Sequence, residues 1–396
     1  MRRILVLLFL APLFLPLYLN ASEVPPVMPK VIIFGNRAMT DEALVSITGL
    51  KDVHDMGADE IKSRLQTSGL FSAVEVYRQD EMVTIYLREK TTWFVVPYLS
   101  KDAAASLYGF AFGKATLYGQ DSRLLGRYQV GTGNREASLL LKDSSFRNTR
   151  WQLGASFDYE DALHREFGGR TGREVIHRTR NEYKGGSFQV GYRVHPYWLI
   201  GVNNYAEHHR FEELNGQFLS GLQWSHRLIT EYSRFYVNEG LSDGVAANAY
   251  FESTNPVSHF DFQKIGGGVQ WGAFRRDRFN WIVRGKMEYG IKAPRYQLFE
   301  LGGGRLRSFS NQQFRGSLYG TVQNDVLLTS VNFWVLRLRP LVYLDWGYIQ
   351  KGGRTGLGTG FQVYVRDVAI PAVQFFAGYG FHPNGFTVAA SIGPNI

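Results

Sequence analysis

The sequence contains no cysteine among its 396 residues, which excludes disulfide scaffolds, thiolate catalysis and cysteine-ligated metals. Beyond the first residues it also lacks any apolar run close to the ~20 residues that a membrane-spanning helix needs, which argues against a helical membrane bundle. Instead it has 28 Phe, 22 Tyr, 8 Trp and 43 Gly. Disordered chains are poor in aromatic residues. The composition therefore indicates a large, folded, glycine-rich β protein.

The N-terminus is typical of a secretory signal peptide. The basic residues Arg2 and Arg3 precede an apolar stretch at residues 4–19, and the small residues Ala21 and Ser22 follow it. We expect residues 1–21 to be a signal peptide and residues 22–29 a linker. The alternative is a membrane anchor that is retained.

The formal net charge of +9 lies in the long C-terminal part, because residues 30–90 carry more acidic than basic side chains. A basic excess is common in nucleic-acid-binding proteins, but for an exported chain we expect no nucleic acid partner. Phosphate-bearing lipid headgroups or the anionic contents of a lumen are better candidate partners. An ordinary solvated surface excess is the alternative.

Residues 30–90 predict a small α+β domain with the order β-α-α-β-β. Thr40 followed by Asp41 and Glu42 is typical of a helix start. Ser68-Gly69 is typical of a helix end, because glycine readily adopts the left-handed conformation. The expected strands and the second helix cover residues 30–34, 59–67, 74–77 and 83–87.

A short motif in this domain resembles the POTRA family. Residues 65–74 carry the pattern Leu-x-x-Ser-Gly-x-Phe-x-x-Val, and Gly35-Asn36 follows the first strand. The residues that we expect to be structural in this motif are Gly35, Asn36, Leu65, Gly69, Phe71 and Val74. The resemblance implies a sheet edge to which an extended polypeptide can add a strand. A small domain without a partner is the alternative.

From residue 91 onward the chain alternates apolar and polar residues in segments of about ten. In residues 279–292 one face is apolar and the other is polar; the apolar face holds Phe279, Trp281, Val283, Met287, Tyr289 and Ile291. Strict alternation indicates strands. A soluble β sandwich also alternates, but an exported chain with many such strands favours a transmembrane antiparallel β-barrel over residues 91–396, with a polar lumen.

Sixteen strands can be placed in this region, an even number that suits a closed barrel. They begin near residues 91, 105, 121, 135, 149, 184, 197, 217, 243, 260, 279, 317, 333, 356, 370 and 386. Long external links are expected at 161–183 and 293–316, while the register of 228–242 stays unassigned. The seam between the first and last strands is expected to include Trp93, Val95, Phe386, Val388 and Ile396.

The link at residues 293–316 contains a glycine run followed by an arginine. Alternation in residues 342–348 places Tyr343, Asp345 and Gly347 toward the lumen. A carboxylate in a partly dry lumen needs a cation, and a guanidinium can offer it two hydrogen bonds. An ordinary lumenal ion pair is the alternative to a specific role.

Taken together, the POTRA-like motif, the glycine run and the strand around Asp345 resemble the BamA/TamA outer-membrane assembly and translocation superfamily. In that family POTRA domains precede a sixteen-stranded barrel, and an external loop folds back into the lumen. The resemblance implies that Arg307 is the arginine of the loop tip and Asp345 its strand partner, with Gly347 and Asp325 beside them. The loop motif then comprises Gly303, Gly304, Leu306, Arg307, Ser308 and Phe309.

The sequence departs from the family pattern in three places. Ser308 stands where the motif usually has glycine, a change expected to alter the backbone of the tip. The last residue, Ile396, is not the aromatic residue typical of the family. Only one POTRA-like domain is present, which leaves little platform for accessory proteins.

The resemblance implies a protein of a Gram-negative-type outer membrane, with its POTRA domain in the periplasm. It implies a role in inserting barrel proteins or translocating polypeptides through the seam and lumen; the alternative is a passive pore that the loop plugs. The implied partners are outer-membrane lipid and lipopolysaccharide, an unfolded client polypeptide and a periplasmic accessory protein. The nine histidines show no catalytic or metal-ligand spacing. We therefore expect no enzyme, cofactor or metal, and interpret the histidines as satisfied surface residues.

Overall fold

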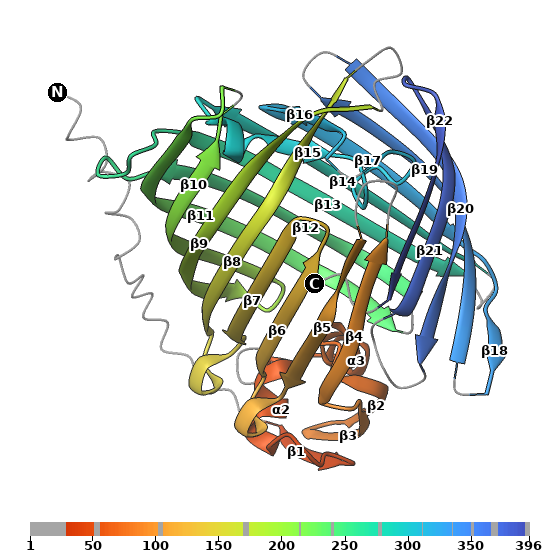
Figure 1. Ribbon diagram of the computed structural model, residues 1–396. Helices are drawn as coiled ribbons and strands as arrows, with labels where there is room; N and C mark the ends of the chain where they lie inside the picture. The colour runs from red at the N-terminus through yellow and green to blue at the C-terminus, as the bar shows by residue number, and fades with distance from the viewer. Residues whose placement is uncertain are drawn as a thin grey trace.

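The computed structural model describes residues 29–50, 56–101, 106–168, 174–213, 215–238, 241–275, 279–310, 312–334, 336–349, 352–365 and 371–392. The predicted signal peptide, nearly all of the linker and Ile396 lie outside these residues. Figure 1 shows a small N-terminal domain at one end of a large ring of strands. Within the described part of the chain, no helix is long and apolar enough to cross a membrane.

The N-terminal domain has two helices on a three-stranded sheet of order β1-β3-β2, in which β1 and β3 are parallel. Its elements are β1 (Lys30–Phe34), α2 (Asp41–Thr48), α3 (Ala58–Thr67), β2 (Phe71–Gln79) and β3 (Met82–Glu89). The Thr40 side chain accepts a hydrogen bond from the Ala43 amide at the start of α2, and Gly49 ends that helix with φ 73°. The element order is therefore the one that the sequence predicts.

Leu65, Phe71 and Val74 lie in the core of this domain, at 0%, 2% and 5% exposure. Gly35 follows β1 with φ +92°, and a Cβ there would lie 2.0 Å from the Leu87 carbonyl oxygen, so only glycine fits. The Asn36 side-chain amide donates to Asp41 Oδ1 at 2.7 Å. These contacts fix the sharp turn between β1 and α2.

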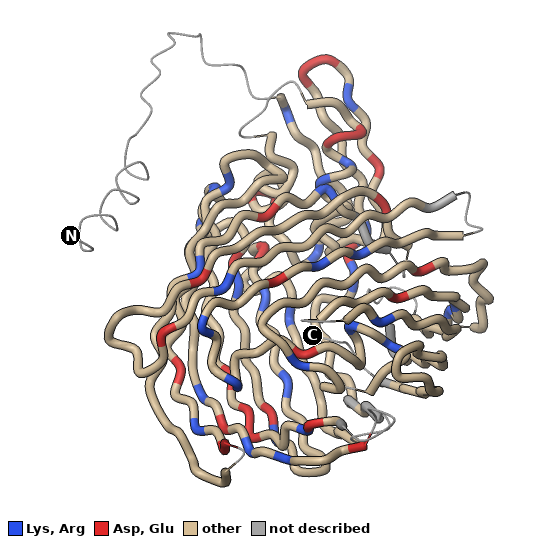
Figure 2. The backbone as a smooth tube through the Cα atoms, turned by 90° about the horizontal axis from the view of Figure 1, so that it is seen from above, with Lys and Arg blue, Asp and Glu red and all other residues tan. Residues whose placement is uncertain are grey.

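The second region is a closed ring of antiparallel strands (Figures 1 and 2). Its strands are β4 (Trp93–Lys101), β5 (Ser106–Ala115), β6 (Ser122–Gly131), β7 (Asn134–Asp143), β8 (Trp151–Gly168), β9 (Glu174–His195), β10 (Trp198–Glu212), β11 (Phe218–Asn238), β12 (Leu241–Thr254), β13 (Gln263–Arg275), β14 (Phe279–Ile291), β17 (Leu318–Leu327), β18 (Val331–Phe333), β19 (Leu336–Ile349), β20 (Gly352–Val365), β21 (Pro371–Phe381) and β22 (Gly385–Ile392). β17 and the three-residue β18 both pair with β19, so β18 continues the line of β17. Sixteen lines of strand therefore surround the lumen, as predicted.

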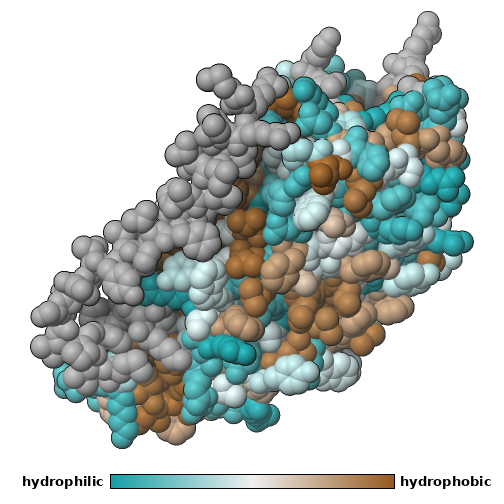
Figure 3. Space-filling view, turned by 90° about the vertical axis from the view of Figure 1, so that its left-hand side faces the viewer, coloured by the Kyte–Doolittle hydropathy of each residue, from teal (hydrophilic) through white to brown (hydrophobic). Residues whose placement is uncertain are grey.

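The walls of the ring are apolar outside and polar inside. On β14, Trp281 and Met287 are exposed at 44% and 62%, whereas Asn280 and Glu288 are buried at 0% and 6%. Figure 3 shows apolar side chains gathered over the side of the molecule that faces the viewer. This arrangement confirms the predicted outer-membrane-type barrel class, in which the apolar face meets lipid.

One predicted feature of the ring is wrong. Residues 161–183 are not a long external link, because β8 and β9 pair through most of this segment up to Gly168 and Glu174. Residues 228–238, whose register the sequence left unassigned, continue β11 and pair with β12. In the first segment, Arg180 pairs with Asp161 of the neighbouring strand at 2.6 Å, and in the second Arg234 pairs with Glu60 of α3 at 3.3 Å. Charged residues are typical of loops, but here they lie on long strands with polar surroundings.

β22 closes the ring against β4 through the residue pairs Ala390–Lys101, Ser391–Ser100 and Ile392–Leu99. The described residues on this side of the ring end at Lys101 and Ile392. Trp93 and Val95 lie on β4 and pair with β5, while Phe386 and Val388 lie on β22 and pair with β21. All four side chains are exposed on the outer surface. They flank the seam, but no described residue pair joins them across it.

Candidate functional site

The chain between β14 and β17 folds back among the barrel strands. It forms a 3₁₀ turn, η4 (Arg295–Gln297), and a hairpin of β15 (Phe299–Leu301) and β16 (Phe314–Gly316), with the tip between them. Leu301, Leu306 and Phe309 are fully buried and pack with Tyr319 of β17 and Ile349 of β19. The link at 293–316 is therefore a returning loop with its own apolar core against the barrel wall.

Glycines make the tight turn of the tip. Gly302 has φ +127°, and a Cβ there would lie 2.0 Å from the Ser310 carbonyl oxygen. Gly303 has φ +58°, and its amide donates to the Phe309 carbonyl at 2.9 Å. The Gly304 carbonyl accepts from Gln323 Nε2 of β17 at 2.8 Å. The turn presents Leu306 and Arg307 to the wall.

Arg307 and Asp345 meet in the interior, 8% and 0% exposed. Arg307 Nε donates to Asp345 Oδ2 at 3.0 Å and Nη2 to Oδ1 at 2.5 Å. The Arg307 backbone amide also donates to Asp345 Oδ2 at 2.9 Å. One carboxylate thus holds both the side chain and the backbone of the tip, a strong charge-assisted arrangement.

Asp325 provides the second carboxylate of the cluster. It lies 2.6 Å from Arg307 Nη2 and 2.7 Å from Arg284 Nη1. Two arginines therefore balance two aspartates, as a buried charge cluster requires. The guanidinium of Arg307 also lies 4.0 Å from the centre of the Tyr343 ring, a favourable cation–π contact.

The wall under the tip is lined by glycines. A Cβ at Gly356 of β20 would lie 2.6 Å from the Ser308 side chain, and one at Gly378 of β21 would lie 2.1 Å from the Tyr343 hydroxyl. At Gly380 it would lie 2.7 Å from the Phe309 ring. At Gly347 of β19 it would lie 3.0 Å from Leu301 Cδ2. We call Gly347, Gly356, Gly378 and Gly380 the glycine floor; they allow the tip to lie directly on the strands.

Ser308 fits this seat without the flexibility of glycine. It is fully buried, and it is not among the described residues with positive φ. Its carbonyl oxygen accepts a hydrogen bond from Thr387 Oγ1 of β22 at 3.1 Å. Ser308 therefore occupies the tip with a backbone conformation that any residue can adopt. Through Ser308 the tip reaches the last strand of the barrel.

A second anchorage lies on the opposite side of the loop, and the sequence did not reveal it. Glu300 Oε1 of β15 lies 2.8 Å from His164 Nδ1 of β8, and the Arg315 guanidinium of β16 pairs with the same carboxylate. Asn181 of β9 contacts His164 Nε2 at 3.2 Å. Burial opposes ionisation of Glu300, but His164 and Arg315 outweigh it and hold the pKa of Glu300 below its usual range.

Interpreting all histidines as surface residues was wrong. His164 and His209 are 8% and 4% exposed inside the ring. The His209 ring lies 4.4 Å from that of Tyr296 in the returning loop. Only the alternation of β8 and β10 could have placed them inside, and their loop partners are far away in sequence.

The structure thus brings together Arg307, Asp345, Asp325 and the tip residues in one cluster, with Gly347 beneath them. The structural residues of the N-terminal motif and the seam residues lie elsewhere, in the small domain and on β4 and β22. The residues that sequence reasoning missed are Glu300, Arg315, His164 and three of the floor glycines. For Glu300 and Arg315, the signal in the sequence was the presence of acidic and basic residues around the glycine run.

No family model and no curated protein sequence matches the chain. Among solved structures it is similar to BamA from Haemophilus ducreyi lacking POTRA domains 1–3, with 15% identity, a TM-score of 0.57, and coverage of 94% of this chain and 85% of that one. It is similar to CdiB from Escherichia coli, with 12% identity, a TM-score of 0.62, and coverage of 92% and 76%. It is also similar to CdiB from Acinetobacter baumannii, with 12% identity, a TM-score of 0.58, and coverage of 92% of this chain and 73% of that one. The chain therefore has the fold of BamA and CdiB, and its predicted resemblance to the BamA/TamA type is confirmed at the level of the fold.

Proposed function

We propose that this protein resides in the outer membrane and assists the insertion of β-barrel proteins, or the translocation of polypeptides, through the barrel seam and lumen. The observation that supports this most is the returning loop whose Arg307 is held between Asp345 and Asp325. Burying a charge cluster costs desolvation free energy, which apolar side chains filling the same space would not require. It is useful where a loop must hold one defined position on the wall.

The loop tip contacts the wall strands next to the seam. It bonds Asp325 of β17, Asp345 of β19 and Thr387 of β22, and rests on glycines of β20 and β21. β22 in turn pairs with β4 to close the ring. The position of the tip is thus coupled to the last strand, where a client strand would enter.

The client would bind by strand addition. A seam that opens exposes two strand edges, and such edges template an incoming strand. The free energy would come from folding of the client, so no hydrolysis is required. In the N-terminal domain, β1 and β2 are the edges of the sheet. They carry the exposed rings of Phe34 and Tyr77, and Tyr86 of the central strand β3 contacts both rings.

The proposed orientation places this domain, which we propose to be a POTRA domain, in the periplasm. There it would receive unfolded client polypeptide, alone or with an accessory protein. The exposed apolar belt of the barrel would contact outer-membrane lipid and lipopolysaccharide.

Photo-crosslinking at the seam tests the proposal. A crosslinking residue at Phe386, outward-facing on β22, should capture client polypeptide in cells. The same residue at Leu344, outward-facing on β19 and 47% exposed, is the matched control and should label lipid only. Lipid labelling alone at both positions would contradict a client path through the seam.

A passive pore plugged by the loop is the second candidate, favoured by a cavity of about 710 Å³ beside the hairpin. Arg307→Ala and the exposed tip variant Arg305→Ala separate the two functions. Under assembly or translocation, Arg307→Ala alone depletes outer-membrane or secreted proteins. Under a passive pore it changes conductance and leaves the protein inventory intact.

A further inference from the structure

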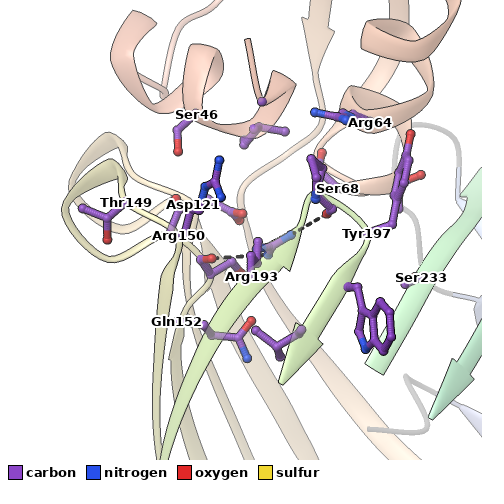
Figure 4. A pocket seen from close by; sticks show the side chains of 18 of the residues that line it. Ser46, Arg64, Ser68, Asp121, Thr149, Arg150, Gln152, Arg193, Tyr197 and Ser233 are labelled. Atoms are coloured by element: carbon purple, nitrogen blue, oxygen red, sulfur yellow. Dashed lines mark hydrogen bonds between the residues drawn. The ribbon is translucent and has the colours of Figure 1, made fainter. Parts of the chain in front are cut away.

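A second cavity lies where the N-terminal domain meets the barrel, far in sequence from the returning loop. Its volume is about 610 Å³, and Figure 4 shows residues of the helical domain and of the barrel strands around it. Ser68 next to α3 accepts from Arg123 of β6 at 2.6 Å. Tyr197 lies between Arg64 of α3 and Arg234 of β11, at 5.2 and 5.7 Å from their guanidinium carbons. These contacts make the domain one wall of the cavity.

The lining of this cavity is strongly basic. Its basic residues are Arg64, Arg123, Lys142, Arg150 and Arg193, against the two acids Asp121 and Glu231. Asp121 lies 3.7 Å from Arg123. Arg193 donates to two carbonyl oxygens, those of Pro196 and Ser144, both at 3.3 Å. The acids therefore leave an excess of positive charge around the cavity.

Lys142 is the clearest unpaired cation. Its neighbour Leu141 is exposed on the outer surface, so the alternation of β7 directs Lys142 inward. Within the residues that the structure describes, Lys142 has no carboxylate at ion-pair distance. Its ammonium group lines the cavity together with Arg123 and Arg193.

Several polar atoms around the same cavity have no protein partner. Gln152 is 2% exposed, and its Nε2 has no hydrogen-bond acceptor; Ser145 Oγ and Arg123 Nε are likewise unpaired donors, whereas Asp121 Oδ1 and Asn148 Oδ1 are unpaired acceptors. Buried donors without partners are costly. Cations and unpaired donors that surround one space indicate a binding site for a group with several acceptor oxygens.

We propose that this cavity binds a phosphate-bearing anion, recognised by Lys142, Arg193, Arg123 and Gln152. A phosphate group offers acceptor oxygens in several directions and suits convergent cations. The volume exceeds what inorganic phosphate fills and lies in the range of small-molecule sites, so it leaves room for an organic ester. Because both α3 and the barrel line the site, the bound anion holds the N-terminal domain against the barrel.

The phosphate can come from a soluble ester or from a lipid headgroup. Titration calorimetry on the full-length protein in detergent, with inorganic phosphate and with sn-glycerol 3-phosphate, tests the soluble source. Native mass spectrometry of protein purified from phosphatidylglycerol-containing and phosphatidylcholine-only vesicles tests the headgroup. Saturable binding of a soluble probe, or selective retention of phosphatidylglycerol, supports the site and assigns its source.

Lys142→Gln should weaken binding about tenfold or more, because it removes a charge-assisted contact. It breaks no described ion pair, so the barrel should keep its folded electrophoretic mobility. Lys286→Gln, on β14 beside Glu288 at 3.2 Å and outside the cavity, is the matched control and should bind as the unmodified protein does.

Gln152→Leu provides an independent readout. Removing a buried unpaired donor should raise the unfolding temperature while it weakens binding, a combination that a purely structural residue would not give. Binding that is absent for both soluble probes and for phosphatidylglycerol would overturn the proposal. Equal affinity of folded Lys142→Gln and unmodified protein would overturn it as well.

Discussion

The two anchorages of the returning loop differ in burial. At the tip anchor, the side chains of Arg307 and Asp345 are 7% and 0% exposed, over a glycine floor. At the hairpin anchor, Glu300 is 26% exposed, and Arg315 and His164 are 14% and 10% exposed. The hairpin anchor also borders the cavity of about 710 Å³. One loop thus has a dry attachment on one wall and a wetter, titratable attachment on the other.

This difference predicts the order in which the loop detaches. Removing one partner of a fully buried pair costs about 3–5 kcal/mol. A pair that keeps partial access to water, as at the hairpin anchor, should cost less. The hairpin should therefore separate from β8 and β9 before the tip leaves Asp345. Four substitutions test the comparison.

The largest effect is expected for Asp345→Asn. It leaves the buried guanidinium of Arg307 without its two-point partner and should destabilise the docked tip by about 3 kcal/mol. Protease accessibility of the loop and thermal unfolding of the barrel measure the change. Asp261→Asn, at an exposed pair with Lys292 at 3.6 Å, is the control. Equal protection of the loop from protease in both variants would show that Asp345 does not hold the tip on the wall.

Gly378→Ala should come next. Its Cβ would lie 2.1 Å from the Tyr343 hydroxyl and 2.6 Å from Ser308 Oγ, and overpacking of this kind costs about 1–3 kcal/mol. Gly320→Ala on β17, where the nearest atom is 3.7 Å away, is the matched control. The unfolding temperature of Gly378→Ala should be lower than that of Gly320→Ala. Equal unfolding temperatures would show that the glycine floor accommodates the added methyl group without loss of stability.

Thr387→Val keeps the shape of the last strand but removes its hydrogen bond to the Ser308 carbonyl. The expected loss is about 1 kcal/mol, because a buried acceptor is left unpaired. Hydrogen exchange of the β22 amides should rise with that of the tip. Faster exchange at the tip with β22 unchanged would show that the two move independently.

Glu300→Gln should have the smallest effect of the four at neutral pH, because Glu300 is 26% exposed and water screens its ion pairs. The pKa of Glu300 in the folded protein is lowered to about 2, so its contribution is complete above the ordinary glutamate pKa of about 4.3 and is lost as the pH falls from there through about 2. Loop protection in the unmodified protein should therefore decrease on acidification from pH 5. The same decrease in Glu300→Gln would assign the pH dependence to another group.

Much of the barrel could be predicted because alternation is local. On β14 and β19 the apolar residues lie outside and Asn280 and Asp345 inside, as their spacing predicts. The pairing of Arg307 with Asp345 was implied by the family resemblance, and the alternation of β19 supported it by placing Asp345 toward the lumen. Local patterns failed where charged residues continue a strand, as in β8 and β9.

The remaining contacts are set by tertiary structure. Glu300 and His164 are 136 residues apart, and neither local sequence predicts contact with the other. Gly356 and Gly378 look like ordinary strand glycines until Ser308 and Tyr343 fill the space above them. The docking of α3 on Tyr197 likewise depends on the closed ring, which brings β10 beneath the small domain.

The reach of the tip from Asp325 to Thr387 has a mechanical consequence. A single turn of chain cross-braces the wall from β17 to β22, so that these strands move as one rigid plate while the tip is seated. Arg284 of β14 also pairs with Asp325, so the brace extends to β14, whereas the described contacts of the tip do not cross the β22–β4 pair. Under the proposed function, the seam at β22–β4 would therefore open by a rotation of several braced strands together rather than by the separation of one strand.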